Sequence, residues 1–267
     1  MSSPLQFLDS SIGRKVLMSL TGLFLCSFLI VHVSGNLALF KNDDGLAFNQ
    51  YSLFMTTFPV IKIISYLLYA TIVLHAISGF RLVFLNQKAR PVKYEARKDP
   101  RSASWASKNM GILGFIILVF LVTHMTNFWY VYKFGDMPWK EYKIDISTDQ
   151  ILDGKGTPIE TSNGELMEAQ NYITYNEAGV PIKTVIIKDL FEVVRVAFEQ
   201  SWLVIFYVIG MIAVAYHMVH GFQSGFQSLG LRHPTYTPVI QGIGVWLFGI
   251  IIPLLFAAMP VYFFFFK

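Results

Sequence analysis

Charged residues are scarce in this chain, and their distribution predicts its fold. Only 14% of the 267 residues are Asp, Glu, Lys or Arg and 54% are hydrophobic, whereas a soluble domain has about 25% charged residues. A helix needs about 20 mostly apolar residues to cross a membrane. Five long stretches carry no charge at all: residues 16–40, 63–80, 109–132, 200–231 and 234–266. The sequence therefore predicts an all-α integral membrane protein, one domain over 1–267, with five transmembrane helices at about 16–40, 60–85, 105–132, 199–228 and 236–264.

Cysteine is nearly absent, and this excludes several kinds of redox site. Cys26 is the single cysteine, so the chain by itself forms no disulfide framework, no Cys-x-x-Cys-His haem attachment and no iron–sulfur cluster. No Gly-x-Gly-x-x-Gly lies between a predicted strand and a helix, so no dinucleotide site is indicated. Flavin or iron–sulfur chemistry would therefore have to lie in partner subunits.

Acidic residues are also few in segment 81–108, which indicates how the chain is oriented. Two acidic residues stand there against eight basic ones, namely Arg81, Lys88, Arg90, Lys93, Arg97, Lys98, Arg101 and Lys108. The positive-inside rule places such a loop in the cytoplasm, and Arg14, Lys15 and Arg232 agree. We expect a multi-pass protein of a bacterial inner membrane with a cytoplasmic N-terminus and Lys267 outside. The first apolar run continues well past signal-peptide length and lacks a small-residue cleavage site, so we expect it to be retained as a span.

Residues 133–188 are polar and rich in turn-forming residues, unlike the stretches on either side. Within them, 172–187 has the pattern of a hairpin with its turn near Asn176–Gly179. We expect a small periplasmic insertion that shields the outer face of the protein rather than a catalytic domain. Residues 189–198 are amphipathic and predict an interfacial helix, and 46–58 form another interfacial segment, closed by Pro59.

Four histidines lie inside the charge-free stretches, at depths that sort them into two pairs. At about 1.5 Å per residue, His32 lies about 27 Å and His124 about 24 Å from the cytoplasmic ends of their spans. His75 lies about 9 Å from the cytoplasmic side, and His217 lies about 26 Å from the outer end of a span that runs inward. The depths predict an outer pair, His32 with His124, and an inner pair, His75 with His217.

An imidazole inside a membrane span indicates a functional site. The simpler interpretation, that each histidine forms a hydrogen bond within the bundle, does not account for four of them pairing by depth. Two facing imidazoles are the axial ligands of an octahedral haem iron. A catalytic zinc would need three ligands and an open position, with acidic or cysteine help, and no acidic residue lies in these charge-free stretches. The pattern predicts metal ligation by His32, His75, His124 and His217 in two haem centres.

Glycines near these histidines favour the haem interpretation. Gly79 follows His75 by four residues, Gly221 follows His217 by four, and Gly35 follows His32 by three. A missing side chain one turn from a ligand leaves room for a flat macrocycle, although helix packing is an alternative use of each glycine. His220 lies one turn from His217 and is the alternative ligand. We expect His233 to be a solvated loop residue.

The order of short motifs along the chain resembles a known family. The motifs are Ser19-Leu-Thr-Gly22 followed by His32, His75-Ala-Ile-Ser-Gly79, Gly114-Phe115 followed by His124, and Tyr216-His217-Met-Val-His-Gly221. With these, the chain resembles the membrane cytochrome b subunit of succinate:quinone oxidoreductases, in particular the five-helix dihaem type of succinate:menaquinone reductase and quinol:fumarate reductase. The resemblance covers all five spans, and the 133–188 insertion is longer than the family leads us to expect.

The resemblance implies a role in respiration and the tricarboxylic acid cycle. It implies two haem b groups, menaquinone or another quinone as substrate, and cytoplasmic flavoprotein and iron–sulfur subunits that interconvert succinate and fumarate. It also implies Ser19 near the propionates of the inner haem. Arg81 is a candidate for the same task because a guanidinium suits a carboxylate, and a plain positive-inside anchor is an equally good interpretation of it. The direction of the reaction and a dimer of such heterotrimers stay open.

The quinone site is poorly specified by the sequence. A menaquinone site in this family often uses a carboxylate near the outer haem to move protons. The carboxylates nearest the first span are Asp43 and Asp44, in a loop that also reads as an ordinary turn, and Asn49, Gln50 and Tyr51 are polar neighbours. No single residue among them is favoured.

Two other functions remain as alternatives. A dihaem cytochrome b of a formate dehydrogenase or hydrogenase uses similar ligands, but differs in helix number and ligand placement and would be recognised by its partners. A transporter in which histidines relay protons predicts acidic partners inside the spans, and the charge-free stretches hold none.

Overall fold

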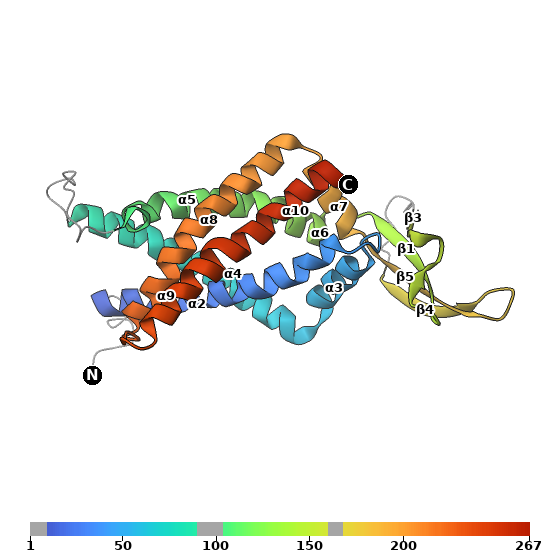
Figure 1. Cartoon of the computed structure of the whole chain (residues 1–267), viewed down its shortest axis with the longest axis horizontal. Coiled ribbons are helices and arrows are strands. Elements are labelled where there is room, and N and C mark those ends of the chain that lie inside the picture. Colours follow the sequence, from blue (N-terminus) through green and yellow to red (C-terminus); the bar gives the residue numbers. More distant parts are fainter. Residues whose placement is uncertain (1–9, 90–103, 160–167) are drawn as a thin grey trace. The chain divides into compact units, whose positions relative to one another are not determined.

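The computed structural model describes residues 10–89, 104–159 and 168–267. The structure is mostly helical, at 73%. Within the described residues, five helices are long and apolar enough to cross a membrane: Ser11–Phe40, Pro59–Lys88, Trp105–Phe134, Ser201–Ser228 and Thr237–Phe266. The five long apolar helices predicted from the charge-free stretches are thereby confirmed (Figure 1), and their length and composition are consistent with a membrane protein. Five of the basic residues used to orient the chain lie outside the described residues: Arg90, Lys93, Arg97, Lys98 and Arg101.

Three of the five long helices change their winding along their length. The first consists of α2 (Ser11–Asn36) and the 3-10 turn η1 (Leu37–Phe40). The third consists of α5 (Trp105–His124), the π-helical turn η2 (Met125–Tyr130) and α6 (Val131–Phe134). The fifth consists of α9 (Thr237–Ile243), the π-helical η4 (Gly244–Ile251) and α10 (Ile252–Phe266). The other two are unbroken, α4 (Pro59–Lys88) and α8 (Ser201–Ser228).

The first helix begins earlier than its apolar run. It starts at Ser11 rather than at residue 16, so Arg14 and Lys15 lie on the helix and not before it. The hydroxyl of Ser10 accepts a hydrogen bond from the backbone N–H of Gly13, at 2.9 Å, which satisfies one of the free donors of the first turn. Helix ends follow backbone hydrogen bonding and capping, so the hydrophobic boundary does not fix them.

The chain divides into two compact units. The first unit contains Met1–Val31, Ile64–Leu121 and Ile205–Ala258, and the second contains His32–Ile63, Val122–Val204 and Met259–Lys267. His75 and His217 belong to the first unit, and His32 and His124 belong to the second. Each predicted histidine pair is therefore built within one unit.

In the first unit, glycines on one helix receive side chains from another. A Cβ on Gly210 of α8 would lie 2.6 Å from the ring of Phe120 on α5, and a Cβ on Gly111 of α5 would lie 3.0 Å from Val83 on α4. Val219 of α8 fills the space beside Gly249 of η4 in the same way. Small residues at helix contacts are how membrane helices approach closely without a hydrophobic driving force between them.

The second unit contains an antiparallel five-stranded sheet. Its strands are β1 (Trp139–Asp145), β2 (Gln150–Ile151), β3 (Thr157–Ile159), β4 (Gln170–Tyr175) and β5 (Pro181–Lys188), in the order β2-β1-β5-β4 with β3 paired to β1. The predicted hairpin is confirmed as β4–β5, with Tyr175 opposite Pro181. Asn176 forms the turn, because its side-chain oxygen accepts from the N–H groups of Ala178 and Val180. The all-α expectation is therefore incomplete, since it missed the sheet around that hairpin.

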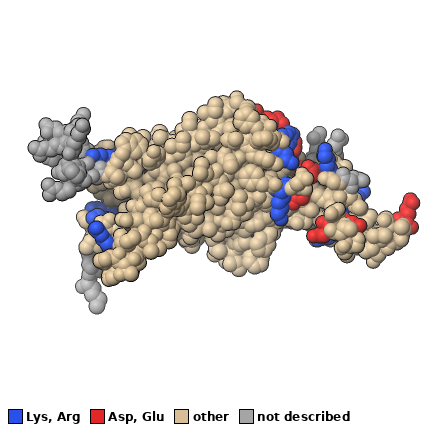
Figure 2. All heavy atoms as spheres, in the orientation of Figure 1, with Lys and Arg blue, Asp and Glu red and all other residues tan. Residues whose placement is uncertain are grey.

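Two short helices cover the sheet and continue its core. Helix α3 (Leu46–Thr57) supplies Leu46 and Leu53, which pack against the buried side chains of Tyr142, Ile144, Val185 and Ile187. Helix α7 (Leu190–Phe198) follows β5 directly, and the Asp189 side chain caps it by accepting from the N–H of Glu192. Both interfacial segments predicted from the sequence are helices. In this unit the charged side chains gather over the sheet and near α7 (Figure 2).

Candidate metal centres

The inner histidine pair joins two helices of the first unit. His75 comes from α4 and His217 from α8, and their ring centroids lie 6.3 Å apart with the ring planes at 68°. Both side chains are half-buried. The structure thus brings together His75 and His217, the two residues that were predicted to pair because they lie at similar depths in their spans.

His75 has a specific polar partner on a third helix. The hydroxyl oxygen of Thr21 on α2 lies 3.0 Å from His75 Nδ1. The next residue, Gly22, lets the ring approach the helix, because a Cβ there would lie 3.3 Å from His75 Cε1. One nitrogen of this imidazole is therefore held, and Nε2 is the nitrogen left to bind a metal.

His217 is held differently from its partner. A Cβ on Gly114 of α5 would lie 3.7 Å from His217 Cε1, an ordinary packing distance. Its Nδ1 is buried and has no hydrogen-bond partner among the described residues. A buried polar atom without a partner is costly, so this ring is one place where the first unit leaves a polar group unsatisfied.

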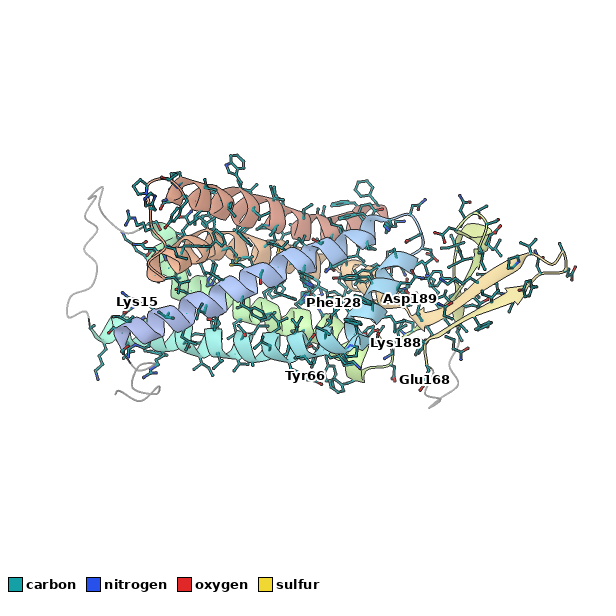
Figure 3. All side chains as sticks on the ribbon, turned by 90° about the horizontal axis from the view of Figure 1, so that it is seen from below. Lys15, Tyr66, Phe128, Glu168, Lys188 and Asp189 are labelled. Atoms are coloured by element: carbon teal, nitrogen blue, oxygen red, sulfur yellow. The ribbon has the colours of Figure 1, made fainter. Side chains whose placement is uncertain are left out.

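The outer histidine pair lies in the second unit. His32 comes from α2 and His124 from α5, with ring centroids 5.8 Å apart and ring planes at 88°. His124 is the last residue of α5 before the π-helical turn η2. Phe128, which Figure 3 labels, belongs to that turn, and its ring centroid lies 5.5 Å from that of His124. Single π-helical turns in longer helices occur frequently at functional sites.

Polar residues flank the outer pair along the first helix. The Asn36 side-chain amide donates to the carbonyl of His32 at 2.7 Å and lies 3.3 Å from His32 Nδ1. Tyr51 of α3 places its ring against Gly35, in the space that a Cβ would occupy. Burial raises the pKa of the Tyr51 phenol, so this side chain is a neutral hydrogen-bonding group at physiological pH.

The distances within both pairs fit one metal ion held between two imidazoles. A metal–imidazole bond is about 2 Å long and the ring centre lies about 1 Å beyond the nitrogen, so two imidazoles on opposite sides of one ion have centroids about 6 Å apart. The observed separations are 6.3 Å and 5.8 Å. Among residues 10–89, 104–159 and 168–267, no group of three or more His, Cys, Asp or Glu side chains forms a metal cluster. The donor set is thus two neutral nitrogens per centre, which is the set that a haem iron takes as its axial ligands.

The glycines expected to make room for a macrocycle divide into two kinds. A Cβ on Gly221 would meet nothing within 4 Å, and a Cβ on Gly79 would meet only the end of Met18, at 3.7 Å. Both positions leave space one turn from an inner-pair histidine. Gly35 does not, because Tyr51 fills the space beside it, so the expectation that Gly35 makes room beside His32 was wrong.

The remaining predicted residues lie as follows. His220 is half-buried on α8, and the ring that faces His75 is that of His217. Ser19 is buried, and its hydroxyl donates to the carbonyl of Lys15 at 2.8 Å. Arg81 is exposed near the end of α4. Ser19 and Arg81 belong to the same unit as the inner pair.

The carboxylates considered for quinone chemistry are engaged in structural contacts. Asp43 accepts hydrogen bonds from the N–H groups of Gly45 and Ala47 and so begins α3. Asp44 forms an ion pair with Lys140 of β1 at 3.0 Å. The carboxylate of Asp44 also accepts a hydrogen bond from the backbone N–H of Gly156.

Lys140 is the centre of a buried polar network in the second unit. Its ammonium lies 3.3 Å from Asp189 as well as 3.0 Å from Asp44. Burial acts to lower the pKa of Lys140, but the hydrogen bonds and charges of Asp44 and Asp189 outweigh it and raise that pKa. Asn49 is 1% exposed, donates to Asp189 at 2.8 Å and to the hydroxyl of Tyr142 at 3.1 Å. This network fastens α3 and its preceding loop to the sheet.

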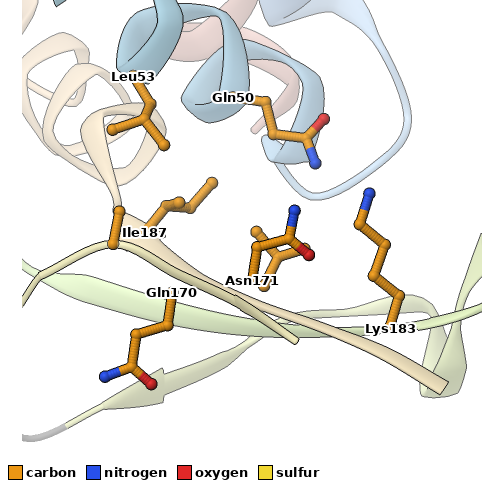
Figure 4. A pocket seen from close by; sticks show the side chains of 8 residues that line it. Gln50, Leu53, Gln170, Asn171, Lys183 and Ile187 are labelled. Carbon is orange, nitrogen blue, oxygen red and sulfur yellow. The ribbon is translucent and has the colours of Figure 1, made fainter. Parts of the chain in front are cut away.

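The second unit also has an open pocket between α3 and the sheet. It has a volume of about 290 Å³ and is lined by Gln50, Leu53, Ala169, Gln170, Asn171, Lys183, Val185 and Ile187 (Figure 4). Its polar lining residues are Gln50 from α3 and Gln170, Asn171 and Lys183 from the sheet. Gln50 therefore faces the sheet.

Sequence reasoning missed the residues that hold the histidines and those that hold the sheet. Thr21 and Gly22 stood in a quoted motif but had no assigned contact with His75, and Asn36 was overlooked although it follows His32 by one turn. A sequence pattern that could have indicated Thr21 is a hydroxyl residue next to a glycine within an uncharged stretch. Lys140 and Asp189 had no such signal, because their pairing depends on the tertiary fold.

Comparison with known proteins adds no assignment. No protein-family model, no curated protein and no solved structure matches this chain.

Proposed function

We propose that this chain is the dihaem cytochrome b membrane subunit of a succinate:quinone oxidoreductase. In this role it anchors cytoplasmic flavoprotein and iron–sulfur subunits and passes electrons between them and a membrane quinone. The observation that carries the proposal is the pair of histidine couples, His75–His217 and His32–His124, each with the centroid separation of two imidazoles on one iron.

The choice of this family over other dihaem cytochromes depends on the sequence. The motifs around the four histidines occur in the order and at the depths of the five-helix dihaem type, and the described part of the chain contains five long apolar helices. A chain with one cysteine cannot itself hold iron–sulfur clusters, so the partner subunits would carry them. The basic excess of 81–108 supports a cytoplasmic position, in a bacterium, for that loop, for the N-terminus and for the docking face of these partners.

The chain's own residues would hold, orient and insulate the two centres. His75 and His217 would hold one haem iron, and His32 and His124 would hold the other. A haem b at each pair would supply one-electron chemistry, with iron alternating between its ferric and ferrous forms. Thr21 and Gly22 fix the ring of His75. Phe128 lies beside the ring of His124, and the ring of Phe198 lies 5.8 Å from that of Phe128. Apolar surroundings limit the access of water, which tunes the redox potential.

A visible spectrum of the purified protein tests the proposal. We expect a reduced-minus-oxidised difference spectrum with low-spin, six-coordinate b-type bands and two haems per chain. Expression with the neighbouring subunits should yield a complex that contains flavin and couples succinate oxidation to quinone reduction. A well-folded preparation with no haem would contradict the proposal and favour proton relay by the histidines. Two haems with a partner other than a flavoprotein would favour the cytochrome of a formate dehydrogenase or hydrogenase.

A further inference from the structure

Thr21 is a buried hydroxyl with three oxygen or nitrogen neighbours. Its Oγ1 lies 2.8 Å from the carbonyl oxygen of Leu17, 3.1 Å from that of Met18 and 3.0 Å from Nδ1 of His75. The Thr21 side chain is 8% exposed. The first two contacts lie within its own helix, and the third joins α2 to α4.

The protons available decide the direction of these hydrogen bonds. A hydroxyl has one proton to donate and two lone pairs that accept. The carbonyls of Leu17 and Met18 only accept, and the shortest contact, at 2.8 Å, is to Leu17. Once the hydroxyl proton is directed to these carbonyls, Thr21 Oγ1 faces His75 as an acceptor. The His75 ring must then carry its proton on Nδ1, which leaves the lone pair of Nε2 free.

We propose that Thr21 is a positioning residue that fixes His75 in the Nδ1–H tautomer and so presents Nε2 to the inner iron. This inference rests on the proposed function for its metal, but the tautomer itself is a property of the protein alone. Gly22 is part of the arrangement, because it admits the ring to within packing distance of the α2 backbone. His217 has no equivalent, since its Nδ1 lacks a partner within the described part of the chain.

The consequence is an inner centre with two unequal ligands. A histidine that donates its second N–H to an acceptor has its tautomer and ring orientation fixed and becomes a more basic ligand. A more basic ligand favours ferric over ferrous iron, so the Thr21 contact lowers the potential of the inner haem. The outer haem should be independent of Thr21, because its ligands are His32 and His124.

The competing explanation is that Thr21 serves only its own helix. Threonine commonly donates to the carbonyl four residues earlier in membrane helices, and the contact with Leu17 is of this kind. Ser27 provides a matched control on the same helix, because its hydroxyl donates to the carbonyl of Phe24 at 2.7 Å and it is exposed. A role in helix structure alone predicts similar results at both positions.

Redox titration of three variants distinguishes the two explanations. Thr21→Val keeps the shape but removes the acceptor, and we expect a higher potential and altered EPR g-values for the inner haem, with about tenfold weaker retention of that haem. Thr21→Ser should restore the wild-type values, and Ser27→Ala should leave both haems unchanged. An inner-haem potential and EPR spectrum that are the same in Thr21→Val as in the wild type would overturn the inference.

A second measurement needs neither haem nor a folded variant. Side-chain 15N shifts of His75 in wild-type protein, prepared without haem, report which nitrogen carries the proton. We expect Nδ1 to be protonated, and a ring protonated at Nε2 would overturn the inference. A wild-type protein that binds no haem but keeps Nδ1 protonated would overturn the proposed function and leave the Thr21 assignment standing.

Discussion

The two histidine pairs have nearly the same separation but different surroundings. The inner pair is backed by one hydroxyl, Thr21, and has open space beside Gly221. The outer pair has the amide of Asn36 next to His32 and a π-helical turn with Phe128 next to His124, and the gap at Gly35 is filled by Tyr51. Two sites with equal ligands but unequal second contacts are expected to differ in potential. The spacing of the histidines therefore sets what can bind, while the neighbouring polar atoms set the properties of each site.

The largest expected effect is the loss of one haem, and not the other, when a single histidine is replaced. We expect His75→Ala or His217→Ala to abolish the inner haem signal and to leave most of the outer one, and His32→Ala or His124→Ala to do the reverse. A bis-imidazole iron with one axial ligand removed loses its low-spin, six-coordinate state. Haem stoichiometry and low-temperature EPR of the purified variants measure this.

His220 provides the control for these substitutions. It lies on the same helix as His217 but its ring is not the one that faces His75, so His220→Ala should retain both haems. Loss of the inner haem from His220→Ala together with retention in His217→Ala would reverse the ligand assignment.

Removal of Lys140 should affect the second unit and not the first. Lys140→Ala leaves the carboxylates of Asp44 and Asp189 without their cation, and a buried charge stripped of its partner costs about 3–5 kcal/mol. Lys143 lies on the same strand but is 57% exposed and 4.0 Å from its nearest carboxylate, so Lys143→Ala should change stability by at most about 0.5 kcal/mol. Thermal unfolding in detergent, with limited proteolysis of the sheet, compares the two variants. Equal stability of both would contradict a structural role for this network.

Alanine substitution at Gly35 and at Gly221 compares a glycine whose neighbouring space is filled with one whose neighbouring space is open. In Gly35→Ala the new Cβ would overlap the Tyr51 ring, so we expect lower stability and a displaced α3, with partial rescue by adding Tyr51→Ala. In Gly221→Ala the protein offers no clash within 4 Å, so the haem-free chain should tolerate it. If a macrocycle occupies that space, Gly221→Ala should instead weaken retention of the inner haem.

The outcome of the Gly221 test depends on comparing haem-free with haem-loaded protein. A Gly221→Ala protein with normal stability and normal haem content would show that the space is not used by the macrocycle. The expectation from helix packing would then be the better account of that glycine.

The sequence was sufficient for the helices and the histidine pairs but not for the contacts between elements. Charge-free length predicts a span, and residue counting along a helix predicts depth, so His75 and His217 could be paired. Depth does not give the rotation of a helix about its axis, so the contact of Thr21 with His75 could not be predicted. Strand β1 was missed because the buried, inward-facing Lys140 interrupts its apolar alternation, and the carboxylates that make this tolerable lie far away in the chain.

The smallest expected effect is a pH dependence at α7. Arg195 donates to Glu192 at 2.6 and 2.8 Å and to Glu199 at 2.6 Å, and the hydrogen bond from Arg195 lowers the pKa of Glu192. A carboxyl with a lowered pKa in the folded state stabilises the protein above its unfolded pKa of about 4.3 and loses that contribution as the pH falls through the lowered value. Because both side chains are about a third exposed, solvent screening limits the contribution to about 0.5 kcal/mol or less.

Glu192→Gln should therefore lower the unfolding temperature slightly at pH 7. This effect should become smaller as the pH falls below the unfolded pKa of about 4.3 and through the lowered pKa of the folded protein. Glu177→Gln, in the turn between β4 and β5, provides the control. This substitution should leave the unfolding temperature unchanged at pH 7 and at pH 3. A Glu192→Gln effect that grows toward pH 3 would contradict the sign argued here. Because Glu192 lies in the second unit, the inner haem spectrum should not change with this substitution at either pH. A change in that spectrum would show that the ion pairs of α7 influence the inner haem.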